Sequence, residues 1–192
     1  AGKVESCELT MIPYIKGMAD TFREYLPTKS VNTPFPDKTT LSKFDKPTEA
    51  EVLQYQKLGY NRAVGMIVWA VRHVCPTGKF GVSQLCGVMA IPGSKAWECA
   101  MHMIAYMEQN CAQGIQFSHK GNTVPVCCVD ASNKPDPFDG ICHAGYCLHL
   151  AGGPAVSKSF KLKHVGLSSE HNEYMGLTAA LRAVVWLRQL LS

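Results

Sequence analysis

Residues 124–133, VPVCCVDASN, decide the fold of this chain, because here the sequence changes from a helical to a strand-like pattern. The apolar run predicts a short, mostly buried strand that ends at Asp130. A second acid, Glu173, lies in residues 167–187, LSSEHNEYMGLTAALRAVVWL, which predict a long helix. Two carboxylates brought together can hold divalent cations over a phosphodiester, so the pair indicates nucleic-acid chemistry.

The residues between the two acids predict the rest of a sheet. Two prolines and a glycine in residues 133–140 are typical of a turn, and residues 141–150, ICHAGYCLHL, alternate well enough for a second strand. Gly152 and Gly153 predict a tight connection to a third strand over residues 155–164. Three antiparallel strands covered by one helix are a recognised opening of an α/β domain.

The final helix has clear start signals and one apolar face. Ser168 or Ser169 is the expected N-cap, and Glu170 lies in the first turn, where the helix dipole favours an acid. The apolar stripe that we expect to face the sheet consists of Tyr174, Leu177, Leu181, Val184 and Leu187 or Arg188.

The sequence before residue 118 has a mainly helical pattern. Four prolines in residues 26–47 predict an extended surface segment. Helical spacing and N-cap signals predict helices over residues 14–25, 48–74, 80–90 and 94–109. Trp69, Trp97 and Trp186 lie in apolar patterns and are expected in the core.

The two patterns together predict a mixed chain of the α+β or α/β class. We expect a mostly helical region over residues 1–120 and a second domain over residues 121–192, with the boundary in the polar stretch 118–123. The second domain is expected to hold the three-stranded meander and one long helix.

The composition fits a globular protein, with 46% hydrophobic and 18% charged residues. A net charge of +4 is compatible with a polyanionic partner but does not require one. Nine cysteines without a repeated spacing favour an intracellular, reducing compartment, the cytoplasm or the nucleus. No apolar run reaches the roughly 18 residues of a membrane span.

In this order the segments resemble the end of the polymerase polyprotein of copia-type retrotransposons. Residues 32–47, NTPFPDKTTLSKFDKP, resemble the Pro-rich linker after the polymerase palm, and residues 60–71, YNRAVGMIVWAV, resemble the helix that follows it. Residues 167–191 are similar to the family's ribonuclease H helix, in which Ser-Ser, Glu-Tyr and Trp-Leu recur at these spacings. The resemblance implies the C-terminal (thumb or connection) part of a reverse transcriptase, followed by a truncated ribonuclease H-like domain that lacks the later strands.

The resemblance also implies roles for single residues. Asp130 matches the first metal-binding acid of ribonuclease H, and Glu173 matches the helix acid that binds the same metals. In that family two Mg²⁺ ions activate a water and stabilise the leaving oxygen during cleavage of the RNA strand of an RNA–DNA hybrid. Asp139 matches an acid of the family's second strand, but Gly140 replaces the Arg that follows it, and Asn133 stands near the place of a further acid.

The ends of the chain limit the activity that we expect. The resemblance implies that the polymerase aspartates would lie before Ala1 and that a fourth strand, with a further acid, would lie after Ser192. Because Ala1 is not a Met, we expect a processed product or a piece of a longer protein. We expect little nuclease activity from this chain alone, and an unpaired edge on strand 124–130 that invites a protein partner.

Each candidate site also has a purely structural explanation. An acid at a strand end often only forms a turn, and an exposed glutamate on a helix often has no role. Lys158, Lys161 and Lys163 could follow a phosphate backbone or simply solvate a strand face.

The cysteines of the second domain have structural explanations as well. Cys142, His143, Cys147 and His149 have the composition of a metal cluster, although strand alternation separates Cys142 from Cys147. Cys127 and Cys128 are expected to be core thiols.

Two functions from different classes therefore remain. In the first, the chain is a retroelement-derived fragment without catalysis of its own that serves as a structural or interaction subunit of a larger assembly. In the second, it is a Mg²⁺-dependent ribonuclease H that acts on RNA–DNA hybrids when the missing strand and acid are supplied.

Overall fold

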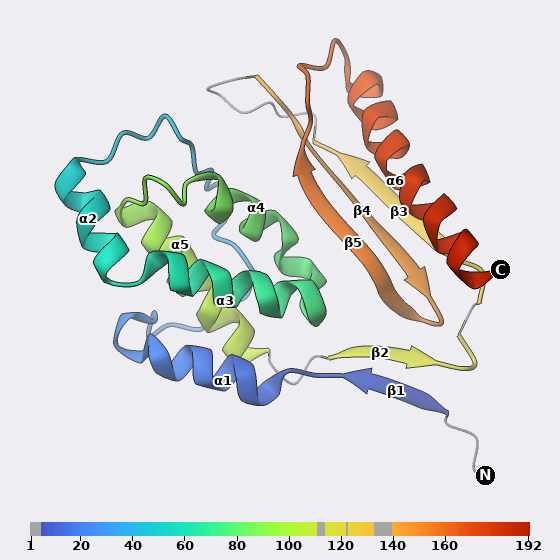
Figure 1. Cartoon of the computed structure of the whole chain (residues 1–192), viewed down its shortest axis with the longest axis horizontal. Coiled ribbons are helices and arrows are strands. Elements are labelled where there is room, and N and C mark those ends of the chain that lie inside the picture. The colour runs from blue at the N-terminus through green and yellow to red at the C-terminus, as the bar shows by residue number, and fades with distance from the viewer. Residues whose placement is uncertain (1–4, 111–113, 122, 133–139) are drawn as a thin grey trace. The chain divides into compact units, whose positions relative to one another are not determined.

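A computed structural model describes residues 5–110, 114–121, 123–132 and 140–192 (Figure 1). Within these ranges the fold is α+β, with six α-helices, a three-stranded antiparallel sheet and a two-stranded sheet. The chain divides into two compact units. The helical unit is Leu9–Gly114, and the sheet unit combines Ala1–Glu8 with Ile115–Ser192.

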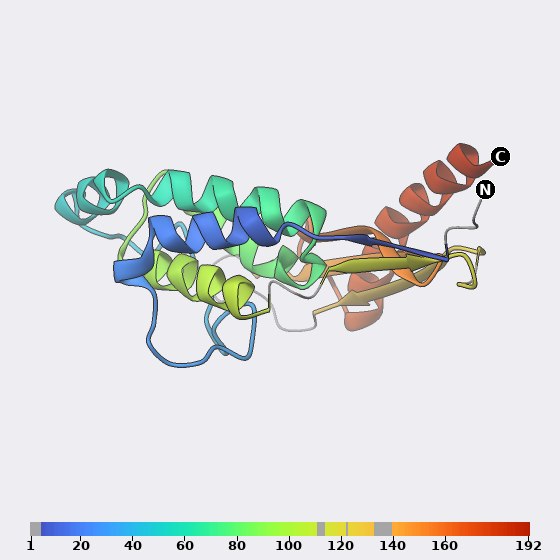
Figure 2. The same cartoon turned by 90° about the horizontal axis from the view of Figure 1, so that it is seen from below.

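The helical unit packs its helices around one apolar core, in which α1, α3 and α5 contact one another (Figures 1 and 2). Its largest fully buried side chains include Tyr60, Ile67 and Leu85. The elements of this unit are α1 (Ile12–Thr21), the 3₁₀ turn η1 (Arg23–Tyr25), α2 (Glu49–Lys57), α3 (Tyr60–His73), the 3₁₀ turn η2 (Pro76–Gly78), α4 (Lys79–Gly87) and α5 (Ser94–Gln109).

The single helix expected over residues 48–74 is wrong, because the chain breaks it into α2 and α3. Thr48 begins α2 with a capping box, in which its hydroxyl accepts from the Glu51 amide and the Glu51 carboxylate accepts from the Thr48 amide. Gly59 then adopts a left-handed conformation with φ of 92°, which ends one helix and starts the next. The helix expected over residues 94–109 is confirmed as α5.

The Pro-rich segment 26–47 contains no helix or strand, but it does not lie entirely on the surface. Val31, Phe35 and Leu41 are buried in it. Two glutamines anchor its backbone, because the Leu41 amide donates to Gln84 Oε1 at 2.9 Å and the Val31 amide donates to Gln109 Oε1 at 2.8 Å. The segment therefore closes one side of the helical core.

The sheet unit contains the expected meander, β3-β4-β5, and a β1–β2 pair that the sequence did not predict. In the tight turn between β4 and β5, Ala151 and Gly152 both have positive φ, 53° and 85°. Two such residues suit the right-handed twist of a hairpin. The elements are β1 (Ser6–Leu9), β2 (Ile115–Ser118), β3 (Val126–Ala131), β4 (His143–Leu150), β5 (Gly153–Lys161) and α6 (Ser169–Leu191).

Helix α6 covers β3 and β4, but with a different face from the one expected. Ser168 is the N-cap, as predicted, and its side chain accepts from the His171 amide. The buried positions of α6 are Asn172, Gly176, Ala180 and Leu187. A methyl group at Gly176 would lie only 3.4 Å from Ala144 Cβ, so small residues allow the helix to approach the sheet closely.

The expected stripe of larger residues on α6 is therefore largely exposed. Tyr174, Leu177 and Leu181 face solvent, which contradicts the prediction that they cover the sheet. The tryptophans divide in the same way: Trp97 is buried as predicted, whereas Trp69 and Trp186 are 52% and 53% exposed. No helix in the described part of the chain is long and apolar enough to cross a membrane.

Candidate functional site

Asp130 lies one residue before the end of β3 and is exposed. Its neighbours Val129 and Ala131 point toward α6, since a methyl group built at Gly176 would lie 3.5 Å from Val129 Cγ1 and 3.9 Å from Ala131 Cβ. Successive side chains of a strand point to opposite faces. Asp130 therefore belongs to the face of the sheet that α6 does not cover.

Glu173 lies in the second turn of α6 and is also exposed. It follows the buried Asn172 and precedes Gly176, where the helix comes closest to the sheet. The structure thus gives both acids access to solvent but assigns them to different layers, one to the helix and one to the open face of the sheet. A magnesium site formed by this pair remains a prediction.

The described residues contain no group of three or more His, Cys, Asp or Glu side chains arranged to hold a metal ion. Two residues that the family resemblance singled out, Asn133 and Asp139, lie outside the described ranges. Gly145 and Tyr146 lie in β4, where they pair with Asp130 and Val129 of β3.

The three lysines expected to follow a nucleic-acid backbone do not share one face of the sheet. Lys158 pairs with Tyr146 in the register of β4 and β5, and Lys161 pairs with His143; the two lysines lie three positions apart along β5, so they point to opposite faces. The Lys158 ammonium lies 5.3 Å from the centre of the Phe160 ring, which favours a local cation–π contact. Lys163 lies beyond the end of β5 and is exposed.

One edge of the sheet is open in the described part of the chain, because β3 pairs with β4 only. The Ser132 amide donates to the His143 carbonyl at 2.7 Å, which fixes the alternation of the hydrogen bonds along the pair. Residues 126, 128 and 130 therefore direct their backbone groups toward β4, whereas Cys127, Val129 and Ala131 direct theirs toward the open edge.

An exposed apolar stripe runs along α6, and we call it the outer stripe. Its members are spaced by three and four residues, so they lie on one face of the helix. Large apolar side chains in a row on a surface indicate an interaction site more strongly than isolated ones. The outer stripe consists of Tyr174, Leu177, Leu181 and Val185.

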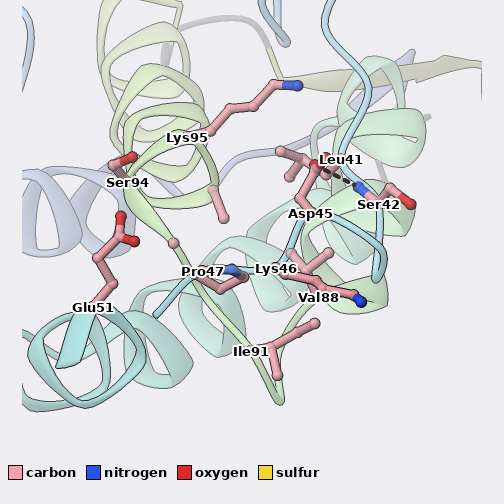
Figure 3. A pocket seen from close by; sticks show the side chains of 12 residues that line it. Leu41, Ser42, Asp45, Lys46, Pro47, Glu51, Val88, Ile91, Ser94 and Lys95 are labelled. Carbon is pink, nitrogen blue, oxygen red and sulfur yellow. Dashed lines mark hydrogen bonds between the residues drawn. The ribbon is translucent and has the colours of Figure 1, made fainter. Parts of the chain in front are cut away.

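The helical unit has a pocket of about 200 Å³ beside the start of α5 (Figure 3). Sequence patterns did not reveal it, because much of its wall comes from the Pro-rich segment, whose course over the helices the sequence does not predict. Two of the polar side chains that line it have partners: Lys95 Nζ donates to the Thr40 carbonyl at 2.8 Å, and Asp45 Oδ2 accepts from the Ser42 amide at 3.1 Å. These contacts stabilise the segment.

Comparison with known proteins finds two relevant similarities. Secreted RxLR effector protein 161 of Plasmopara viticola is 29% identical over 128 residues, which make up 67% of this chain and 90% of that protein. The retrovirus-related Pol polyprotein from transposon TNT 1-94 of Nicotiana tabacum is 28% identical over 167 residues, 85% of this chain.

The matched region is only 12% of the length of the Pol polyprotein. No family model matches the chain, and no solved structure matches it. The similarity to the Pol polyprotein supports a retrotransposon-related origin.

Proposed function

We propose that this chain is a copia-type, retroelement-derived module of reverse transcriptase and ribonuclease H ancestry that has no catalytic activity by itself. Its function is to join a larger assembly as a structural or interaction subunit. The observation that carries this proposal is the open edge of β3 together with the outer stripe of α6. Both surfaces belong to the sheet unit, and α6 packs on β3 more extensively than on any other strand.

The backbone of β3 offers the directional part of such an interaction. Cys127, Val129 and Ala131 point their amides and carbonyls to the open side, and a strand added there would pair with them. Exposed Val126 adds an apolar side chain at the same strand. An edge of this kind, with few charges, is a template for pairing with another chain.

The outer stripe offers the apolar part. Burial of four large apolar side chains would contribute about 1.5–3 kcal/mol each if they became fully buried. Such a contact explains why α6 uses small residues toward its own sheet and large residues toward solvent.

The similarity to the effector protein also supports an interaction role. The similar region accounts for 90% of that protein, so an equivalent of most of this chain occurs without a polymerase around it. We extend to this chain only the idea of a free-standing module, and not the effector's export.

The first experiment measures the size of the isolated chain by light scattering over a range of concentrations. We expect concentration-dependent association, and Leu177→Gln with Leu181→Gln should reduce it. Arg182→Gln is the matched control, because it introduces the same side chain on an exposed position of α6 outside the outer stripe. A stable monomer at every concentration would count against the proposal.

Hydrogen exchange identifies the part played by β3. The amides of residues 126, 128 and 130 should be protected in every state, because they donate to β4. The amides of Cys127, Val129 and Ala131 should gain protection only on association. If association leaves the exchange of Cys127, Val129 and Ala131 unchanged, the edge is not the interface.

A second candidate function is Mg²⁺-dependent cleavage of RNA–DNA hybrids. The position of Asp130 near a strand end, the position of Glu173 early in α6 and the similarity to a Pol polyprotein favour it. The test compares hybrid cleavage with Mg²⁺ by the unaltered chain and by Asp130→Asn. Equal, negligible rates would eliminate this candidate, whereas a rate that depends on Asp130 would replace the first proposal.

A further inference from the structure

Two cysteines face each other on the side of the sheet that α6 does not cover. Cys128 of β3 is directly opposite Cys147 of β4 in the strand register. Cys127 and Val129, on either side of Cys128, point to the α6 face, so both thiols of the opposed pair lie on the other face. Cys128 is exposed and Cys147 is half-buried, which corrects the expectation that Cys128 is a core thiol.

The Cα spacing of this pair lies within the range of disulfide bonds, and the Cβ atoms, about 4.5–5.5 Å apart in such pairs, must approach to about 3.5–4.5 Å when the bond forms. Since Ser132 and His143 form a hydrogen-bonded pair, every second pair back along β3 does so too, and this includes Cys128 with Cys147. Directly opposed residues in such a pair have Cα atoms about 5.5 Å apart. Disulfides most often join Cα atoms about 5.5–6 Å apart.

An imidazole nitrogen lies beside one of the thiols. His149 Nε2 is 3.7 Å from Cys147 Sγ, and both residues lie on the same face of β4. Burial raises the pKa of the Cys147 thiol, and the neighbouring Cys128 and Cys127 raise it further. Cys147 therefore keeps its proton more readily than an ordinary thiol, and a nearby imidazole can remove that proton when the sulfur reacts.

We propose that Cys128 and Cys147 are an oxidation-sensitive thiol pair that a hydroperoxide converts to a disulfide, with His149 as the proton acceptor for Cys147. This inference rests on the geometry of β3 and β4 and is independent of the function proposed above. It differs from the structural explanation, in which the cysteines only fill space.

The reaction balances in two steps. The exposed Cys128 thiolate attacks one oxygen of the hydroperoxide, the O–O bond breaks, and the protonated leaving group departs as water or an alcohol while Cys128 becomes a sulfenic acid. Cys147 sulfur then attacks Cys128 sulfur as its proton passes to His149. The S–O bond breaks, the departing hydroxide takes a proton from the His149 imidazolium or from solvent and leaves as water, and the two thiols have together lost two electrons to the peroxide.

The experiment treats the full chain at low concentration with hydrogen peroxide and maps the crosslink by mass spectrometry without reduction. We expect an intramolecular Cys128–Cys147 link whose loss of mass equals the two thiol hydrogens. Cys128→Ser and Cys147→Ser should abolish it, and Cys127→Ser, which alters the adjacent thiol on the other face, should retain it. A link that survives in Cys128→Ser, or one that joins two chains, would overturn the proposal.

His149→Gln tests the proton acceptor separately. Formation of the disulfide should slow several-fold in this variant, and a dimedone trap should capture more sulfenic acid at Cys128, because only the second step is affected. Unchanged rates and trapping would remove His149 from the proposal. The disulfide should also raise the melting temperature of the oxidised chain by roughly 5 °C, because it links β3 to β4 covalently and so constrains the unfolded chain. Cys147→Ser should lack this shift.

Discussion

At the scale of single residues, Asn172 is the least expected member of the sheet unit's core. Its side chain is 4% exposed, and its Nδ2 donates to Cys142 Sγ at 3.3 Å. Its Oδ1 is buried and has no hydrogen-bond partner among the described residues. A buried polar atom without a partner costs about 1–3 kcal/mol, so this residue lowers the stability of the unit.

We therefore expect Asn172→Leu to raise the free energy of unfolding of the sheet unit by about 1 kcal/mol, because an apolar group of similar size removes the uncompensated oxygen. Asn172→Asp is the control of similar shape, and it should destabilise the unit because it introduces a charge there. Urea unfolding measures both. A clear loss of stability in Asn172→Leu would mean that the amide does make an essential hydrogen bond.

Tyr60 gives the helical unit a dependence on alkaline pH. Its hydroxyl donates to the Leu85 carbonyl at 3.0 Å, and burial raises the pKa of this group well above 10.0. Burial likewise raises the pKa of Cys99 from 9.0 to about 11. In the unfolded chain both groups lose their protons at lower pH than in the folded chain. Their contribution to the free energy of unfolding is therefore fully present below about pH 9 and falls as the pH rises.

The measurement is the free energy of unfolding of the helical unit between about pH 8 and pH 11. Tyr60→Phe should cost about 1 kcal/mol at neutral pH, because it leaves the Leu85 carbonyl without its donor, and it should flatten the alkaline decline. Tyr174→Phe, on the exposed side of α6, is the control and should change neither. An undiminished alkaline slope in Tyr60→Phe would refute the assignment.

At the scale of elements, the sequence predicted the type of most helices and strands but not which face of α6 is buried. Helical periodicity and caps located α5 and the start of α6, because local signals determine them. The large apolar residues of α6 suggested the wrong inner face, since tight packing on a sheet favours Gly176 and Ala180. The short strands β1 and β2 escaped prediction because their pairing joins residues far apart in sequence.

The candidate site was less predictable than the fold. The sequence located Asp130 near a strand end and Glu173 early in a helix, but the face to which each belongs depends on the strand register. Likewise, Cys128 and Cys147 became a pair only when β3 and β4 were aligned. A sequence motif gives the residue types, whereas the register and alternation of side chains along paired strands determine which of these residues lie close together.

Gly176 tests how closely α6 must approach the sheet. Gly176→Ala should be tolerated or stabilising by up to about 1 kcal/mol, because its methyl group would make ordinary contacts at 3.4–3.9 Å and alanine favours helix. Gly176→Leu should destabilise by about 1–3 kcal/mol through overpacking against Ala144 and Val129. Thermal unfolding of both variants measures the difference, and equal stability would show that the contact is loose.

At the scale of the whole molecule, the two units have cores of very different size. The helical unit buries a large cluster that includes Tyr60, Ile67 and Met103. The principal cluster of the sheet unit is formed by Ala131, Cys142, Ala144 and Leu162. Since burial of apolar surface is the main stabilising contribution, the sheet unit should be the less stable of the two.

We expect calorimetry to resolve two unfolding transitions, with the sheet unit unfolding at the lower temperature. Asn172→Leu should shift only the first transition and Tyr60→Phe only the second, because the two residues lie in separate cores and their effects should be independent. A single transition that both variants shift together would show that the units unfold as one.

The pairing of β1 with β2 constrains the order in which the chain can fold during synthesis. The His119 amide donates to the Glu5 carbonyl at 3.2 Å, and the whole helical unit is encoded between these two residues. A ribosome that adds about 5–20 residues per second needs on the order of 5–20 s to produce the intervening chain. The helical unit can therefore be complete before β1 meets β2, so the sheet unit is assembled last, from segments on both sides of the helical unit.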